Sequence, residues 1–338
     1  MQRSHSTRRA HCIRLFCLGI FSAAVLGSAP TISHAQSAAD YPSRALTLVS
    51  PFPPGGGNDG VGRLLAHEVS QILGQSIVVE NRPGAGGNVG TSTVARSSPD
   101  GYTLVLAQNS IMAINPAIYA KPGFHPTEDF EPVSQITSAP LVLVVKDDSP
   151  YQTLNDYIAD AEKRPGDVSY ATPGSGTMSH LAGSILAKAR SLDLMHVPYR
   201  GAGPAINDLL GGQVAMLITS PPSVEGLVRE GKLRVLAATH ENRVGVFAQS
   251  PTTASQGLPE ISIEGWYGVF VPKGTPKDRI DTLHAAISKA LKAPAVIEKI
   301  RSDGANVVGS SPDELRQTLA REIDYWKTAV RDTGIAIQ

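Results

Sequence analysis

Cysteine is almost absent from this chain of 338 residues. Both of its cysteines, Cys12 and Cys17, lie within the first 20 residues. Beyond this leader the sequence therefore excludes disulfide bonds, thiolate metal sites and cysteine nucleophiles. The remaining histidines also lack the H-x-H or H-x-x-x-H spacing of a metal site, since they stand at positions 67, 125, 180, 196, 240 and 284. We expect neither a metal nor a cofactor.

Catalytic and nucleotide-binding motifs are missing as well. Ser175 is flanked directly by glycines, so the G-x-S-x-G nucleophile elbow is absent. No G-x-x-x-x-G-K-S/T phosphate loop occurs, and Val89 stands where the dinucleotide fingerprint G-x-G-x-x-G requires glycine. These absences favour a binding protein over an enzyme.

The chain has no strong excess of one charge and, beyond the leader, no long apolar run. Of the 30 basic residues, four lie within residues 1–35, which contain no acid, so 26 basic residues remain against 30 acidic ones. This mildly acidic body argues against nucleic acid as a partner. Beyond the leader, no segment is long and apolar enough to cross a membrane.

The leader has the pattern of a secretory signal peptide. A basic start is followed by an apolar stretch from Ile13 to Leu26 and by Ser33-His34-Ala35, which resembles an A-x-A cleavage site. An N-terminal membrane anchor is the alternative, but the apolar stretch is short for a membrane span. We expect residues 1–35 to be a signal peptide that is cleaved near Ala35, and the mature protein to be periplasmic.

Short apolar runs alternate with helix-like segments along the chain. The expected strands are 46–49, 77–79, 103–107, 141–145, 168–170, 194–197, 214–218, 235–238 and 266–271. The expected helices are 60–73, 89–96, 153–163, 178–190, 205–210, 223–229, 276–292, 294–302 and 312–331. Such alternation is typical of an α/β fold with mostly parallel sheets.

Two segments, 140–145 and 265–272, have the pattern of crossovers between two lobes. A chain that leaves one lobe and later returns to it needs two such hinge connections, and the C-terminal helices would then cover the first lobe. We expect lobe 1 to comprise residues 41–141 and 264–338, and lobe 2 to comprise residues 142–263.

Four glycine-rich loops each run into an expected helix. They are PFPPGGGN (51–58), NRPGAGGN (81–88), TPGSGT (172–177) and YRGAGP (199–204). A glycine loop at a helix start leaves backbone N–H groups free at the positive end of the helix dipole, and such a site binds an anion without any charged side chain. Because two loops fall in each half of the chain, they suggest two lobes that face each other across an anionic ligand.

The candidate ligand-binding residues come from these loops and from the ends of strands. Ser175 and Thr177 either donate to a carboxylate or cap the following helix, and His180 either orients a ligand or is structural. Others follow strands, at the carboxyl edge where open α/β sheets bind ligands. The full set is Phe52, Gly55, Gly56, Gly57, Asn58, Gly84, Gly86, Gly87, Asn109, Ser175, Thr177, His180, Thr219 and Ser220.

Several motifs taken together resemble a known family. They are YPSR (41–44), PFPPGGG (51–57), ENRPGAGG (80–87), PDGYTL (99–104), SHLAG (179–183), HVPYRG (196–201) and DLLGGQV (208–214). Over residues 41–335 the chain resembles the substrate-binding proteins of tripartite tricarboxylate transporters, also called the Bug family. The resemblance implies a two-lobed periplasmic binding protein fold with two hinge crossovers and C-terminal helices.

The same resemblance implies a function. The ligand would be a small carboxylate (a di- or tricarboxylate, an acidic amino acid or an aromatic acid) held by the loops 52–58, 84–88 and 174–180. The receptor, expected to be a monomer, would deliver this ligand to a membrane permease of two unlike subunits. An alternative output is a carboxylate-sensing receptor that feeds a membrane signalling kinase; a secreted hydrolase or lyase is less favoured.

The sequence departs from the family pattern at two places. Family members often carry Asp where this chain has Ala215, and an acidic residue near the strand end where Thr219 and Ser220 stand. Fewer acids at this edge would disfavour a ligand that bears an ammonium group. We therefore expect a plain carboxylate rather than an amino acid.

Overall fold

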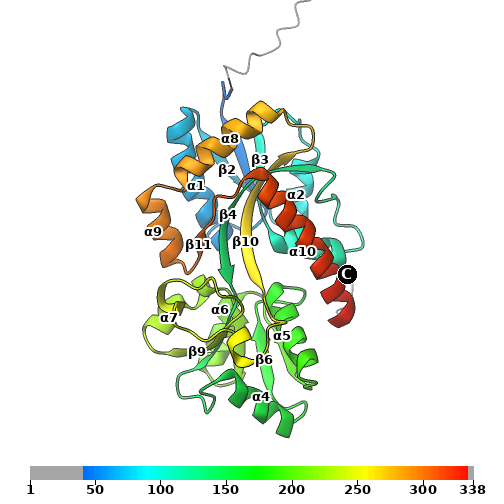
Figure 1. Cartoon of the computed structure of the whole chain (residues 1–338), viewed down its shortest axis with the longest axis vertical. Helices are drawn as coiled ribbons and strands as arrows, with labels where there is room; N and C mark the ends of the chain where they lie inside the picture. Colours follow the sequence, from blue (N-terminus) through cyan, green and yellow to red (C-terminus); the bar gives the residue numbers. More distant parts are fainter. Residues whose placement is uncertain (1–40, 334–338) are drawn as a thin grey trace, which may run out of the picture. The chain divides into compact units, whose positions relative to one another are not determined.

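The computed structural model describes residues 41–333. The expected signal peptide, its cleavage near Ala35 and both cysteines therefore lie outside the described residues. Within that range the chain forms an α/β fold built on two sheets (Figure 1). No helix in the described range combines the length and apolar character that crossing a membrane requires.

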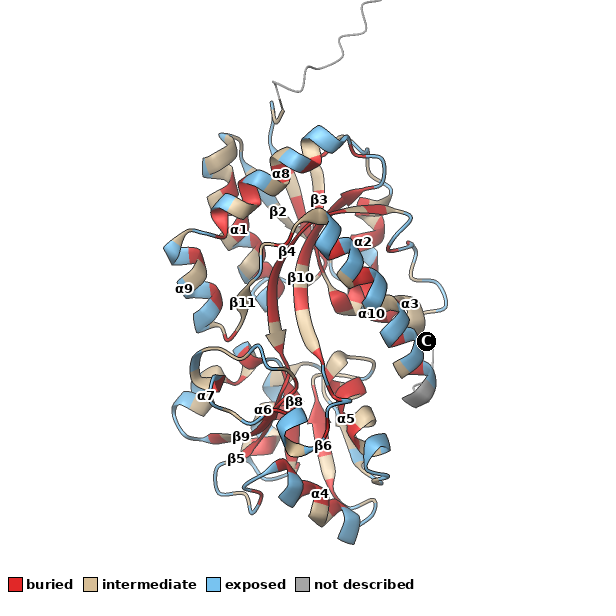
Figure 2. Ribbon diagram, viewed as in Figure 1, coloured by how far each residue is buried: buried red, intermediate tan, exposed pale blue. Residues whose placement is uncertain are grey.

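The first sheet has six strands in the order β11-β4-β10-β3-β1-β2. They are β1 (Leu46–Ser50), β2 (Ile77–Asn81), β3 (Thr103–Gln108), β4 (Phe130–Pro140), β10 (Glu264–Pro272) and β11 (Asn306–Val307). The helices of this part are α1 (Gly57–Leu73), α2 (Asn88–Ala95), α3 (Asn115–Ile118), α8 (Lys277–Ala290), α9 (Pro294–Ser302) and α10 (Pro312–Thr333). The middle of β3 is apolar and buried throughout, as expected for a strand that is covered on both faces (Figure 2).

The second sheet has five strands in the order β7-β6-β8-β5-β9. They are β5 (Val142–Lys146), β6 (Ser169–Thr172), β7 (Met195–Pro198), β8 (Met216–Thr219) and β9 (Leu233–Ala238), accompanied by α4 (Leu154–Lys163), α5 (Met178–Ala189), α6 (Ala202–Leu210) and α7 (Glu225–Arg229). Helix α4 starts with a capping box, in which the Thr153 side chain accepts from the Asp156 N–H and the Asp156 carboxylate accepts from the Thr153 N–H.

Both sheets are mixed, so the expectation of mostly parallel sheets needs correction. The pairs β1–β2, β1–β3, β6–β7 and β6–β8 are parallel, whereas β10 runs antiparallel to β3 and β4, β11 to β4, and β5 to β8 and β9. Strands β5 and β10 each follow a crossover and run antiparallel to both of their neighbours, because a chain that passes from one sheet to the other enters it against the direction of the strands already there. Strand β11 is antiparallel to β4 without following a crossover.

Strand β4 is the one long element that the sequence pattern misses. It carries buried polar residues, among them Ser134 and Gln135, which hide its strand character. Distant groups satisfy them: the Ser134 hydroxyl donates to the Ser310 carbonyl at 2.8 Å, and the Gln135 N–H donates to the Ser310 hydroxyl at 2.9 Å.

The crossovers meet at one buried residue, Thr239. Its N–H donates to the Leu141 carbonyl at 2.9 Å, and its hydroxyl accepts from the Leu141 N–H at 2.8 Å and donates to the Ile263 carbonyl at 2.5 Å. The first crossover lies at the start of the expected segment 140–145, between β4 and β5. The expected second segment, 265–272, is instead part of strand β10, so the chain crosses before Glu264. The lobe boundaries themselves stay a prediction.

The C-terminal helices pack on the first sheet. Helix α8 lies against α1 and β4, and α10 lies against β4 and the π-helical turn Ser110–Ile114. Helix α10 also contacts α5 of the second sheet, so it touches elements on both sides of the crossovers.

Candidate functional site

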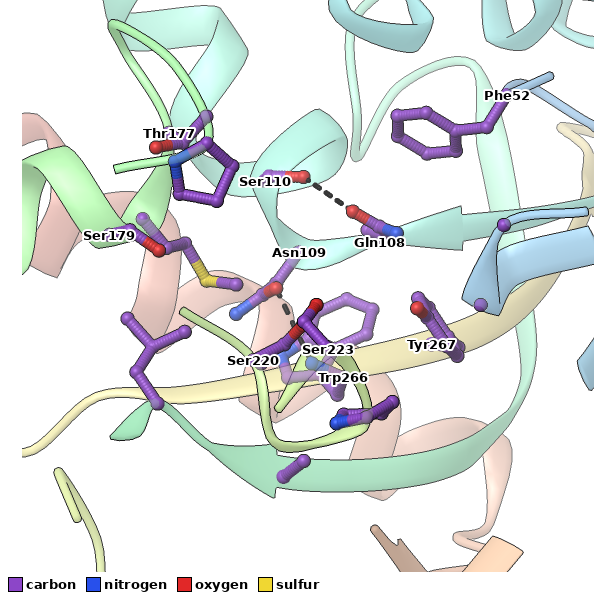
Figure 3. Close-up of a pocket in the computed structure, with 18 of the residues that line it drawn as sticks. Phe52, Gln108, Asn109, Ser110, Thr177, Ser179, Ser220, Ser223, Trp266 and Tyr267 are labelled. Atoms are coloured by element: carbon purple, nitrogen blue, oxygen red, sulfur yellow. Dashed lines mark hydrogen bonds between the residues drawn. The ribbon is translucent and has the colours of Figure 1, made fainter. Parts of the chain in front are cut away.

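A cavity of about 740 Å³ is lined by loops that follow strands of both sheets. Glycine loops contribute to two parts of its wall, at the N-terminus of α1 and at the N-terminus of α5. Figure 3 shows Thr177 and Ser179 on one side of this cavity and Phe52 and Tyr267 on the other. We refer to these sides as the α5 end and the α1 end.

At the α1 end, the triple glycine forms the helix start. Gly55, Gly56 and Gly57 all line the cavity, and the helix N-cap, Gly56, has no side chain to occupy the first-turn N–H groups. These N–H groups have no carbonyl partner within the helix, so they remain available to an anion. A Cβ added at Gly57 would lie 3.0 Å from the Tyr267 hydroxyl, so the lack of a side chain lets the two groups approach closely.

The polar residues that follow these glycines fix the loop. Asn58, a predicted ligand contact, is buried away from the cavity lining; it accepts from the Ser50 hydroxyl at 2.7 Å and donates to the Leu106 carbonyl at 2.9 Å. Asp59 accepts from the Gly55 N–H at 2.9 Å and pairs with Arg63. Hydrogen bonds from Arg63 and then from the Gly55 N–H lower the pKa of Asp59 to about 2.

In the loop around 84–88, glycine is required mainly by the backbone conformation and the packing. Of its three candidates only Gly86 lines the cavity. Gly84 and Gly87 have φ values of +137° and +97°, and a Cβ at Gly87 would lie 2.4 Å from the side chain of Ile111. Only glycine fits there, because both the backbone conformation and the packing exclude a side chain.

At the α5 end, the hydroxyl of Thr177 caps the helix. It accepts from the His180 N–H at 3.3 Å and donates to the Gly174 carbonyl at 2.8 Å. Ser175 and Thr177 both line the cavity. The N–H groups of Met178 and Ser179 lie in the first turn of α5, where no helical carbonyl can accept from them.

His180 lies behind this loop, outside the cavity lining. Its Nδ1 atom accepts from the Gly176 N–H at 3.1 Å, and its ring stacks on the ring of His196. His196 in turn lies 2.7 Å from the Thr172 hydroxyl through Nε2. Burial lowers the pKa of both imidazoles, that of His196 to about 4 with a further contribution from His180. His180 therefore shapes the loop rather than lining the cavity.

Asn109 forms part of the wall between the two ends, but its amide is already engaged. Its Nδ2 atom donates to the Glu264 carbonyl at 2.9 Å and to the Glu322 carboxylate at 3.1 Å, while its Oδ1 atom accepts from the Trp266 N–H at 3.4 Å, the last bond being drawn in Figure 3. The Trp266 indole N–H also donates to Glu322, at 2.7 Å. Asn109 thus joins the end of β3 to the start of β10 and to α10.

The last two candidates, Thr219 and Ser220, differ in whether they line the cavity. Ser220 lines the cavity, and its hydroxyl lies 3.2 Å from that of Ser223. Thr219 is fully buried beneath it and does not line the cavity.

Sequence reasoning missed several lining residues: Gln108, Tyr119, Ser223, Trp266, Tyr267, Lys299 and Asp303. Trp266 and Tyr267 lie in an expected strand, where aromatic residues are ordinary, so nothing local marked them. Within residues 41–333 no three histidine, aspartate or glutamate side chains gather as a metal site would require.

Two α/β sheets joined by crossovers, with helix N-termini of both around one cavity, define a solute-binding protein of the periplasmic binding protein class. The sequence matches the profile described as "Tripartite tricarboxylate transporter family receptor" over residues 61–335. The chain belongs to this family. It is a solute-binding receptor and not an enzyme, so the hydrolase or lyase alternative falls away.

Relatives support the same assignment. Protein BugT of Bordetella pertussis (strain Tohama I) is 38% identical over 325 residues, which cover 96% of this chain and 98% of BugT. The solved structure of R. palustris Rpa4515 with adipate has a TM-score of 0.79 at 33% identity and covers 88% of this chain and 99% of that one. The solved structure of MatC (Rpa3494) from Rhodopseudomonas palustris with bound malate has a TM-score of 0.75 at 32% identity. The match covers 86% of this chain and 100% of the MatC chain.

Proposed function

We propose that this protein is an extracytoplasmic receptor that binds a small carboxylate, either a di- or tricarboxylate or an aromatic acid, and delivers it to a tripartite tricarboxylate-type permease. The observation that carries the proposal is the presence of two helix N-termini, those of α1 and α5, in the wall of one cavity. Each offers first-turn N–H groups and the positive end of a helix dipole to a negative group.

The cavity fits this class of ligand in size and lining. Its volume lies within the range of about 300–1,000 Å³ that is typical of small-molecule sites. Phe52, Tyr119 and Trp266 give it apolar surface for a carbon skeleton, while hydroxyls and backbone amides supply donors. Relatives solved with adipate and with malate add support for a carboxylate.

The lining residues among the candidates are the proposed ligand contacts: Phe52, Gly55, Gly56, Gly57, Gly86, Asn109, Ser175, Thr177 and Ser220. Asn109 would contact the ligand through its carbon atoms or carbonyl, since both amide hydrogens have partners. The other candidates, Asn58, Gly84, Gly87, His180 and Thr219, would support the loops from behind.

The remaining parts of the proposal concern the cell. The family description names a transporter, which supports delivery to a permease of two unlike subunits. The chain would reach the periplasm by means of its leader, with cleavage near Ala35, and act there as a monomer whose lobes close on the ligand.

A thermal-shift screen of ligand-stripped protein tests the proposal. A carboxylate at 100 times its Kd adds about 2.7 kcal/mol to the free energy of unfolding, which shifts the melting temperature measurably. The panel comprises malate, adipate, citrate and benzoate, each repeated in a second buffer to separate binding from anion effects. No shift with any of these acids would count against the proposal.

A further inference from the structure

Lys299 and Asp303 are the charged residues among those that line the cavity. Both come from the end of α9, a helix that sequence reasoning did not connect with ligand binding. The Lys299 ammonium lies 2.5 and 2.7 Å from the two carboxylate oxygens of Asp303. The two charges therefore cancel, and the cavity lining as a whole is close to neutral.

The pair belongs to the α1 end of the cavity. The pKa of Tyr267 is raised to about 12 by burial, with the nearby Asp303 carboxylate contributing. The same Tyr267 hydroxyl lies 3.0 Å from the position of a Cβ at Gly57. Helix α9, which carries Lys299, also contacts α1, and Lys299, Tyr267 and the α1 glycines all line the cavity. The Tyr267 hydroxyl, the α1 amides and the Lys299 ammonium are each able to donate to a carboxylate.

Electrostatic attraction favours the exchange of Asp303 for a ligand carboxylate as the partner of Lys299. The side chains of Lys299 and Asp303 are 59% and 40% exposed, and an exposed i,i+4 ion pair contributes little to stability because water screens it. Releasing Asp303 therefore costs Lys299 little. A ligand carboxylate that α1 and Tyr267 already hold would be less exposed to water, so its attraction to the ammonium would be larger.

We propose that Lys299 is a specificity-determining residue. It breaks its ion pair with Asp303 and pairs instead with a second carboxylate of the ligand at the α1 end, while the first carboxylate occupies the α5 end. This inference rests on the proposed function and narrows it to ligands with at least two carboxylates. Asp303 holds Lys299 ready beside the cavity when no ligand is bound.

The test is a calorimetric comparison of acids that differ by one carboxylate. Adipate and malate are the probes, and pentanoate and lactate are the matched acids that lack one carboxylate. For Lys299→Met, which keeps most of the apolar side chain, we expect binding of the dicarboxylate to weaken about tenfold and that of the matched monocarboxylate less than about twofold. Lys289→Met is the control, since Lys289 is an exposed lysine in the last turn of α8 and does not line the cavity.

Two further variants separate charge from structure. Lys299→Arg keeps the charge and should recover most of the affinity, whereas Asp303→Asn frees Lys299 and should tighten dicarboxylate binding about twofold, by the value of the exposed pair. Equal weakening of both acids by Lys299→Met, or no weakening of either, would overturn the role of Lys299 while leaving the receptor function intact. Failure of the wild type to bind any of the four acids would overturn the inference, and the receptor function as well only if citrate and benzoate also fail to bind.

Discussion

The imidazole rings of His180 and His196 lie face to face, with centroids 3.9 Å apart and planes inclined by 7°. One ring belongs to α5 and the other to β7, and on its other face His196 stacks on Tyr170. Two charged imidazoles at this distance would repel each other, and burial removes the water that would screen them. The pair is therefore built for neutral rings, and this makes the α5 end of the cavity sensitive to acid.

The first prediction is a loss of stability in mild acid. The pKa of His196 is lowered to about 4 in the folded protein, mainly by burial, against 6.5 without these surroundings. The unfolded state therefore binds more protons between these values, so stability is full above pH 6.5 and falls as the pH drops towards 4. Urea unfolding of the wild type and of His196→Phe across this range measures the effect, and the variant should show a shallower fall. His67→Gln, at an exposed position, should follow the wild type, and equal slopes for all three proteins would contradict the prediction.

Ligand binding should weaken over the same range. Protonation of His180 at Nδ1 removes the acceptor of the Gly176 N–H, which lies in the loop that lines the α5 end. Because burial lowers the pKa of His180 below 6.5, we expect the affinity for malate or adipate, measured by calorimetry, to fall more steeply as the pH drops below 6.5 in the wild type than in His180→Asn, whose side-chain oxygen does not titrate. Parallel curves would show that this histidine does not couple protons to binding.

A second prediction concerns the close approach at the α1 end. Gly57→Ala places a methyl group about 3.0 Å from the Tyr267 hydroxyl, so one of the two must shift and the α1 amides move with the backbone. We expect carboxylate binding to weaken about tenfold with little loss of stability. Tyr267→Phe removes the oxygen, so the double variant should bind better than the sum of the two single effects predicts. Strict additivity in calorimetry would show that the contact does not position the loop.

The sequence anticipates those parts of the molecule that local patterns encode. The α/β alternation and the capped helix starts depend on neighbouring residues, and residues 55–57 and 175–177 of two glycine loops do line the cavity. Gly84 and Gly87 belong to a loop with the same local pattern. Glycine is needed at both positions because the backbone φ is positive, and at Gly87 also because the Ile111 side chain packs against it. A glycine motif alone cannot separate an anion site from a tight turn.

What the sequence does not anticipate depends on distant partners. In strand β4 the buried Ser134 hydroxyl and Gln135 N–H find their partner in Ser310, far along the chain. The amide hydrogens of Asn109 are not free to bind a ligand because Glu264 and Glu322 accept both of them. Lys299 reaches the cavity through the placement of a whole helix. No local composition marks any of these relationships.

A third prediction concerns Glu322, the partly buried carboxylate behind the cavity. It accepts from the Trp266 indole at 2.7 Å, from Asn109 at 3.1 Å and from the Trp326 indole at 3.4 Å. Glu322→Ala leaves these buried donors without an acceptor, which should reduce the free energy of unfolding by about 2–4 kcal/mol. Urea unfolding measures it, and Glu314→Ala, at an exposed position on the same helix, gives the scale for loss of an accessible carboxylate. A loss below about 0.5 kcal/mol would contradict the structural role.

The pH dependence of stability in the wild type and in Glu322→Gln is a further test of the role of Glu322. Burial raises the pKa of Glu322 above its usual value of 4.5, although hydrogen bonds from Trp266 and Asn109 oppose the shift. The native state therefore binds more protons than the unfolded state just above pH 4.5, so this residue makes stability fall as the pH rises through that window. Glu322→Gln cannot titrate and should lack this component. Equal slopes of stability against pH in the wild type and in Glu322→Gln would show that another group causes this component.

The last prediction concerns Thr239, whose hydroxyl joins the two crossovers. Thr239→Val keeps the shape of the side chain but leaves the buried Leu141 N–H and Ile263 carbonyl without that hydroxyl. Each unsatisfied buried group costs about 1–3 kcal/mol, so the variant should lose at least about 2 kcal/mol of stability in urea unfolding. Thr282→Val removes an exposed hydroxyl-to-carbonyl bond within helix α8 and should lose less than about 0.5 kcal/mol. Because Leu141 also lines the cavity, a loosened link at Thr239 should weaken carboxylate binding as well. A destabilised variant with wild-type affinity would show that the link supports the fold without positioning the cavity wall.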